Sequence, residues 1–136
     1  MAGGKERTGA VAGRAVYHSH MSDSLHAAAR LRIVLVGTQH PGNIGSAARA
    51  MKTMGLRGLV LVAPERFPHQ DAVAMAAGAG DVLDSARVVP DLATAVADCR
   101  LVLGCTARSR RIALDELLPR EAAARAVATA AAPAGT

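Results

Sequence analysis

The sequence predicts an α/β domain in which a parallel sheet is flanked by helices. Three short apolar runs, at 33–36, 59–62 and 101–104, have the length and composition of buried strands. Helical periodicity follows the first two runs, and strands that alternate with helices are typical of parallel sheets covered on both faces. The chain has 136 residues and is 51% apolar, which suffices for one domain with a core.

The expected elements alternate along the chain. A strand at 32–37 leads through turn-forming residues into a helix that Gly55 ends. Gly78 stops the second helix, and Pro90 or Asp91 starts the third. The predicted strands are 32–37, 59–62, 87–89 and 101–104, and the predicted helices are 43–54, 70–78, 91–98 and 119–132.

The first 29 residues differ from those that follow. Residues 1–14 are rich in glycine, alanine and charge without periodicity, which indicates a flexible tail. We therefore divide the chain into a flexible tail at 1–29 and a domain at 30–136. Met21 is a second possible translation start, and it begins a short polar lead into the first strand.

Charge and composition narrow the classes of function. Sixteen Lys and Arg against eleven Asp and Glu give a net charge of +5, which suits a polyanionic partner, although a solvated basic surface explains it equally. One Phe, one Tyr and no Trp leave no aromatic platform for base stacking, which argues against single-strand-binding modules. No apolar run approaches a membrane span, and no signal peptide is evident.

Cys99 and Cys105 show neither metal-ligand spacing nor a disulfide framework. We expect small, mostly buried thiols in a reduced, cytoplasmic setting, and no metal site.

The segment 40–55 is the most informative part of the chain. Ile44, Ala48 and Met51 share one face of the predicted helix, whereas Arg49 lies on the polar face. Arg49 is thus held on a helix that starts at the carboxyl end of a strand, where open α/β sheets bind ligands. Asn43 stands at the expected helix start, where an asparagine caps backbone N–H groups.

The pattern Asn43-x-Gly45-x-x-x-Arg49 resembles the first signature of the SpoU (TrmH-type) RNA ribose methyltransferases of the knotted SPOUT class. The resemblance extends over residues 31–121. It implies a Rossmann-like half of the SPOUT fold and S-adenosylmethionine as methyl donor. Within the family, the match is closest to cytoplasmic, homodimeric enzymes that methylate the 2′-hydroxyl of cytidine or uridine in the anticodon loop of tRNA.

By this resemblance Arg49 and Asn43 are catalytic residues. A guanidinium can hold a phosphate through its planar fork and can stabilise a developing alkoxide. Asn43 would orient the ribose or Arg49. The simpler interpretations are a solvated helix arginine and a helix cap. His40 is a less favoured general base, because it has no carboxylate partner at short spacing.

A second motif, at 104–111, follows the apolar run 101–104 directly. By resemblance Cys105, Thr106 and Ala107 contact S-adenosylmethionine, largely through backbone groups. The cationic side chains assigned to RNA phosphates are Arg108, Arg110, Arg111 and, on the first helix, Lys52. A solvated charge run is the simpler interpretation of the arginine cluster.

Two further signatures of the family, which build the knot and most of the methyl-donor pocket, have no counterpart in this sequence. We therefore expect the amino-terminal portion of such an enzyme without its carboxyl-terminal trefoil knot, inactive as this chain alone. The alternative is a non-catalytic RNA-binding or dimerising α/β module. A generic nucleotide-binding protein is less favoured, because the first strand is followed by neither a Gly-x-Gly-x-x-Gly nor a P-loop motif.

Overall fold

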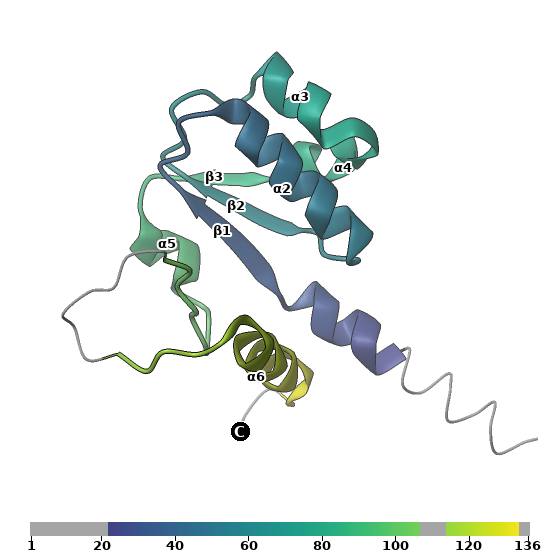
Figure 1. Cartoon of the computed structure of the whole chain (residues 1–136), viewed down its shortest axis with the longest axis vertical. Coiled ribbons are helices and arrows are strands. Elements are labelled where there is room, and N and C mark those ends of the chain that lie inside the picture. The colour runs from purple at the N-terminus through teal and green to yellow at the C-terminus, as the bar shows by residue number, and fades with distance from the viewer. Residues whose placement is uncertain (1–21, 107–113, 134–136) are drawn as a thin grey trace, which may run out of the picture.

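The computed structural model describes residues 22–106 and 114–133, and it confirms a parallel sheet flanked by helices (Figure 1). The elements in chain order are β1 (Arg32–Val36), α2 (Pro41–Thr53), β2 (Gly58–Val62), α3 (Gln70–Ala76), the 3-10 helix η1 (Ala77–Ala79), α4 (Gly80–Asp84), β3 (Arg87–Val89), α5 (Leu92–Val96) and α6 (Pro119–Ala131).

The central strand β2 organises the sheet, whose order is β1-β2-β3 with both pairings parallel. Side chains alternate between faces along a strand. Leu59 and Leu61 therefore enter one core cluster, and Val60 and Val62 enter another on the opposite face. All four side chains are at most 4% exposed, as expected for a strand covered on both sides.

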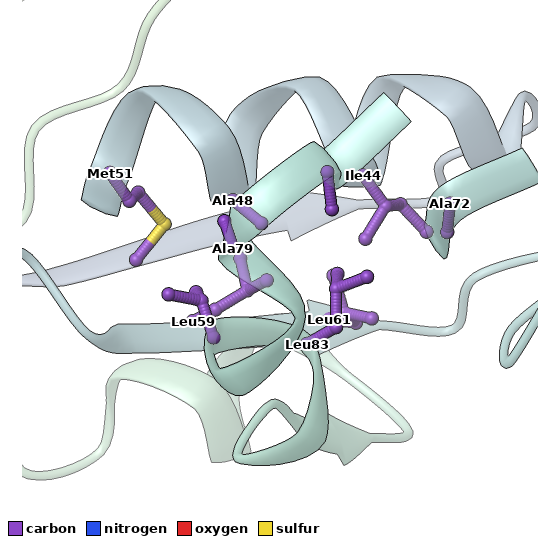
Figure 2. Close-up of a cluster of buried hydrophobic side chains, with 10 residues drawn as sticks. Ile44, Ala48, Met51, Leu59, Leu61, Ala72, Ala79 and Leu83 are labelled. Carbon is purple, nitrogen blue, oxygen red and sulfur yellow. The ribbon is translucent and has the colours of Figure 1, made fainter. Parts of the chain in front are cut away.

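The larger core lies between the sheet and the layer of α2, α3 and α4 (Figures 1 and 2). Helix α2 contributes Ile44, Ala48 and Met51, the face that the sequence periodicity predicted. Both crossover connections, β1 to β2 and β2 to β3, thus cover the same side of the sheet.

Helices α2 and α3 approach each other closely at Gly45. A Cβ atom at this position would overlap the carbonyl oxygen of Ala72 and would lie 2.8 Å from the amide nitrogen of Ala76 and 2.9 Å from Cβ of Met75. The expected role of Gly45 in close backbone approach is therefore confirmed. A side chain of any size here would separate the two helices.

The start of α2 differs from the sequence prediction. The helix begins at Pro41 with His40 as N-cap, and no side chain caps it, so the prediction that Asn43 is the cap is wrong. Proline is pre-organised for the first helical position, which moves the start two residues toward the N-terminus. Asn43 consequently lies inside the first turn.

The predicted end of α2 is confirmed. Gly55 has φ +72°, its N–H donates to the carbonyl of Lys52 at 3.1 Å, and the N–H of Leu56 donates to the carbonyl of Met51 at 2.9 Å. This pair of bonds is a Schellman motif. The second helix ends earlier than predicted, because Ala77 turns to φ +49° and η1 follows, so Gly78 is not its stop.

Helix α5 covers the second face of the sheet, where Ala95 is buried with Val60, Val62 and Val89. The predicted cap is confirmed, since the Asp91 carboxylate accepts a hydrogen bond from the amide of Thr94 at 2.7 Å.

A bidentate ion pair ties the end of α5 to the first residue of β1. Nη1 and Nη2 of Arg32 lie 2.7 and 3.0 Å from the two carboxylate oxygens of Asp98. Nη1 also donates to the carbonyl of Ala95 at 2.7 Å.

The predicted strand at 101–104 does not form. Residues 101–106 have no ladder partner, and the side chains of Val102 and Leu103 are 55% and 37% exposed. Arg32 holds Asp98 at the start of β1, whereas Arg100 hydrogen-bonds to the end of α6. An apolar run becomes a strand only where a ladder partner is available, and the composition of 101–104 does not specify one.

Part of the predicted tail is helical. Residues 22–29 form a helix, and Ala27 is 4% exposed. Three alanines and Leu25 give this segment helical propensity, which the sequence prediction underestimated. Residues 1–21 lie outside the described residues. The predicted helix at 119–132 is confirmed as α6.

We expect Gly45→Ala to lower the free energy of unfolding by about 2 kcal/mol or more, because the added methyl group meets backbone atoms that cannot turn aside. Gly42→Ala is the matched control on the same helix, since its new Cβ would lie 3.4 Å from the flexible Met75 side chain. It should be neutral or stabilising by up to about 1 kcal/mol. Urea unfolding measures both, and equal effects would contradict the close approach.

The Arg32 hydrogen bond lowers the pKa of Asp98 from 3.8 to about 2. Because the folded pKa is the lower one, the pair's contribution to stability is present above about pH 4 and is lost as the pH falls toward 2. An NMR titration of the Asp98 carboxyl should have its midpoint near 2. In Arg32→Gln the midpoint should return toward 3.8, and a wild-type midpoint already there would disprove the pairing.

Candidate functional site

The carboxyl ends of the three strands are joined by backbone hydrogen bonds. The N–H of Gly37 donates to the carbonyl of Val62 at 2.8 Å, and that of Ala63 donates to Val89 at 3.0 Å. Two residues further along the loop after β2, the amide of Glu65 donates to the carbonyl of Thr38 at 3.1 Å. The loop before α2 and the loop before α3 therefore form one connected rim at this edge of the sheet.

Asn43 and Arg49 lie on α2, the helix that starts at this rim. Both are exposed, and they stand six residues apart, about 9 Å along the helix axis. Among the residues that the structure describes, no hydrogen bond or ion pair engages the side chain of either residue. The buried side chains of Ile44 and Ala48 fix α2 against the core. The helix backbone therefore holds Arg49 in a fixed position facing solvent.

Lys52 is placed differently from Arg49, although both are cations of α2. Its Nζ donates to the carboxylate of Asp81 at 2.8 Å and to the carbonyl of Gly78 at 2.9 Å. The Lys52 hydrogen bond lowers the pKa of Asp81. Lys52 thus connects α2 to η1 and α4, while its side chain remains 48% exposed.

The sequence motif did not reveal Asp81 as the partner of Lys52. The two residues are 29 positions apart, and only the packing of α4 against α2 brings them together. This pairing leaves Arg49 as the cation of α2 whose charge no described carboxylate offsets.

The two charged side chains of α2, Arg49 and Lys52, are both cations. The helix contains no Asp or Glu, and its first turn has neither a side-chain cap nor an acidic residue. The partial positive charge of its N-terminus therefore faces the rim uncompensated, next to Asn43. An anionic substrate group would find favourable potential from Asn43 to Arg49.

The two histidines of the rim differ in their contacts. His40 supplies the backbone N-cap of α2 but no side-chain cap. Nδ1 of His69 accepts a hydrogen bond from the amide of Asp71 at 3.1 Å and so caps α3. The sequence analysis missed this cap, for which the only signal was a histidine two residues before an aspartate.

The second predicted motif is described only in part. Cys105 and Thr106 are exposed and lie in the irregular segment that follows α5. Ala107, Arg108, Arg110 and Arg111 lie outside the described residues. Helices α2 and α5 cover opposite faces of the sheet, so the described part of the second motif follows a helix of the other layer.

Within residues 22–106 and 114–133, no three His, Cys, Asp or Glu side chains gather as a metal site would require. In the same ranges, no helix combines the length and the apolar character that crossing a membrane demands.

Comparison with known proteins supports the predicted resemblance. The family model described as "SpoU rRNA Methylase family" matches residues 30–127. Two curated relatives are the tRNA (cytidine/uridine/adenosine-2′-O-)-methyltransferase TrmJ of Pseudomonas aeruginosa, 64% identical over 94 residues, and the tRNA (cytidine/uridine-2′-O-)-methyltransferase TrmJ of Salmonella typhimurium, 54% identical over 101 residues. These matches cover 69% and 74% of this chain but only 37% and 42% of the relatives.

Solved structures agree with the fold. The crystal structure of TrmJ from Z. mobilis superposes with a TM-score of 0.67 at 45% identity, over 70% of this chain and 43% of the other. A methylase family protein from Neisseria gonorrhoeae gives a TM-score of 0.65 at 34% identity, over 76% of this chain and 57% of the other.

Replacing Arg49 and replacing Lys52 should have different effects on the free energy of unfolding. We expect Arg49→Ala to change the free energy of unfolding by no more than about 0.5 kcal/mol, because its side chain is exposed and engages no described group. Lys52→Ala should cost more and should raise the pKa of Asp81 toward its ordinary value. Urea unfolding and an NMR titration measure these effects, and a larger loss from Arg49→Ala would reveal a structural role.

Proposed function

The chain belongs to the SpoU rRNA methylase family, and from that membership we propose that residues 30–127 carry the amino-terminal part of an S-adenosylmethionine-dependent tRNA 2′-O-ribose methyltransferase. The observation that carries the proposal is the exposed, unengaged guanidinium of Arg49 at the position of the family's first motif. The names of the TrmJ relatives favour tRNA methylated on the 2′-hydroxyl of cytidine or uridine as the product. That the target lies in the anticodon loop is our proposal from the sequence resemblance. A tRNA substrate suits a cytoplasmic setting.

Arg49 serves the RNA side of the reaction. Its planar guanidinium can hold a phosphate next to the target ribose through two parallel hydrogen bonds. It can also stabilise the negative charge that develops on the 2′-oxygen as the proton leaves. A guanidinium remains a cation at neutral pH, so the proton must go to another acceptor.

Asn43 supports this assignment by position. It lies in the first turn of the same rigid helix, where its amide can donate to a ribose hydroxyl and accept from it. Lys52 is the weaker RNA contact, because Asp81 already offsets its charge. The arginines at 108, 110 and 111 remain proposed phosphate contacts beyond the described residues.

The methyl donor is assigned from the family, not from a pocket in this chain. Cys105 and Thr106 lie exposed in an irregular segment. Two hollows near α6 are lined by other residues, such as Arg100 and Thr129 in one and Arg30 and Ala130 in the other. The described residues therefore do not by themselves fit S-adenosylmethionine. We propose that the donor site requires further family elements and a second subunit, as in a homodimer.

A graft tests the proposal. Residues 30–127 would replace the matching segment of the Pseudomonas aeruginosa relative, which is 64% identical where the two align. We expect the chimera to methylate tRNA at 2′-hydroxyls, and the 136-residue chain alone to transfer no methyl group. In the chimera, Arg49→Ala should reduce single-turnover methylation at saturating tRNA on the order of a hundredfold.

The matched control is Arg57→Ala, which removes an exposed arginine between α2 and β2, at the end of the sheet away from the rim. It should leave the single-turnover rate within about twofold. A folded chimera that binds tRNA but never methylates it would favour the alternative, a non-catalytic RNA-binding module. Equal rates for Arg49→Ala and the parent chimera would remove Arg49 from the chemistry.

A further inference from the structure

Helix α6 is attached to the rest of the domain with little apolar burial. Of its thirteen residues only Ala130 is buried, at 7% exposure, and Val127 remains 51% exposed. A helix that docks stably on a domain normally covers a stripe of apolar side chains several residues wide. The hydrophobic effect therefore contributes little to holding α6 in place.

Two arginines from distant parts of the chain hold the C-terminal end of α6 instead. Nη1 of Arg30 donates to the carbonyls of Ala132 at 2.8 Å and Ala130 at 3.2 Å. Nη2 of Arg100 donates to the carbonyls of Thr129 at 3.0 Å and Ala132 at 3.3 Å. Arg30 precedes β1 and Arg100 follows α5, so the two guanidiniums converge on the helix end from separate segments.

The carbonyls at the end of α6 are favourable hydrogen-bond acceptors for cations. The last carbonyls of a helix have no partner within it, and they carry its partial negative charge. Two cations at this end satisfy the carbonyls and complement the dipole. The contact is nevertheless open to water, because hollows lined by Arg30, Ala130 and Ala131 and by Arg100 and Ala128 flank it.

We propose that α6 is a latch that Arg30 and Arg100 keep closed, and that it opens as a unit while the three-stranded core stays folded. Regions with few buried apolar contacts and exposed polar contacts open locally at lower free energy than the whole domain unfolds. Once released, a helix of this length is marginal in water and loses its hydrogen bonds along its whole length. Opening also frees both guanidiniums. This inference does not depend on methyl transfer.

Amide hydrogen exchange on the 136-residue chain tests the latch. In the wild-type chain, amides throughout α6 should exchange faster than those of β2. Arg30→Ala and Arg100→Ala should each accelerate exchange in α6 by about tenfold, the equivalent of one hydrogen bond to a charged group. Exchange in β2 should stay within about twofold of wild type.

Arg66→Ala removes a positive charge at a position far from α6 in the sequence. It should change the amide exchange rates of neither α6 nor β2. Added salt should speed exchange in wild-type α6, because it screens the contact between cation and dipole. Acceleration of β2 together with α6 in the arginine variants would show that α6 and the core open as one body. Acceleration confined to the last turn would show simple fraying, and either result would overturn the latch.

Discussion

The close approach of α2 to α3 at Gly45 is the constraint on which the described fold depends most. With no Cβ at this position, the backbones of the two helices meet, and both can lie on the same face of a narrow sheet. Ile44 and Ala48 then pack in one core cluster with Leu59 and Leu61 of β2 (Figure 2). Because α2 is fixed on one side by the sheet and on another by α3, its polar face is fixed as well. The placement of Arg49 follows from a glycine four residues earlier.

Much of the fold could be predicted from local patterns. The runs in β1 and β2 are short, apolar and β-branched, and the period of Ile44, Ala48 and Met51 matches the helix face that is buried. Gly55 ended its helix as expected, because its positive φ is required by a specific pair of backbone bonds. Such features depend on a few neighbouring residues, so one sequence suffices to see them.

The errors arose where distant residues decide the outcome. The run at 101–104 has strand composition, yet it pairs with no described strand, because composition alone does not fix the neighbour that a ladder needs. The motif placed Asn43 and Arg49 together on one helix, but it could not show that Asp81 engages Lys52 and leaves Arg49 unengaged. Sequence periodicity identified the polar face of α2, whereas packing decided which of its cations is available to a ligand.

The outer edge of β1 governs how this protein should behave when it is concentrated. Within the described residues β1 pairs only with β2, so one row of its amide and carbonyl groups faces away from the sheet. The strand reads Arg-Ile-Val-Leu-Val, without the lysine or proline that soluble proteins place on such edges. Its single charge, that of Arg32 at the start of the strand, is already paired with Asp98. The edge is therefore a template for intermolecular β-pairing, and colloidal stability should depend on whatever segment or molecule covers it.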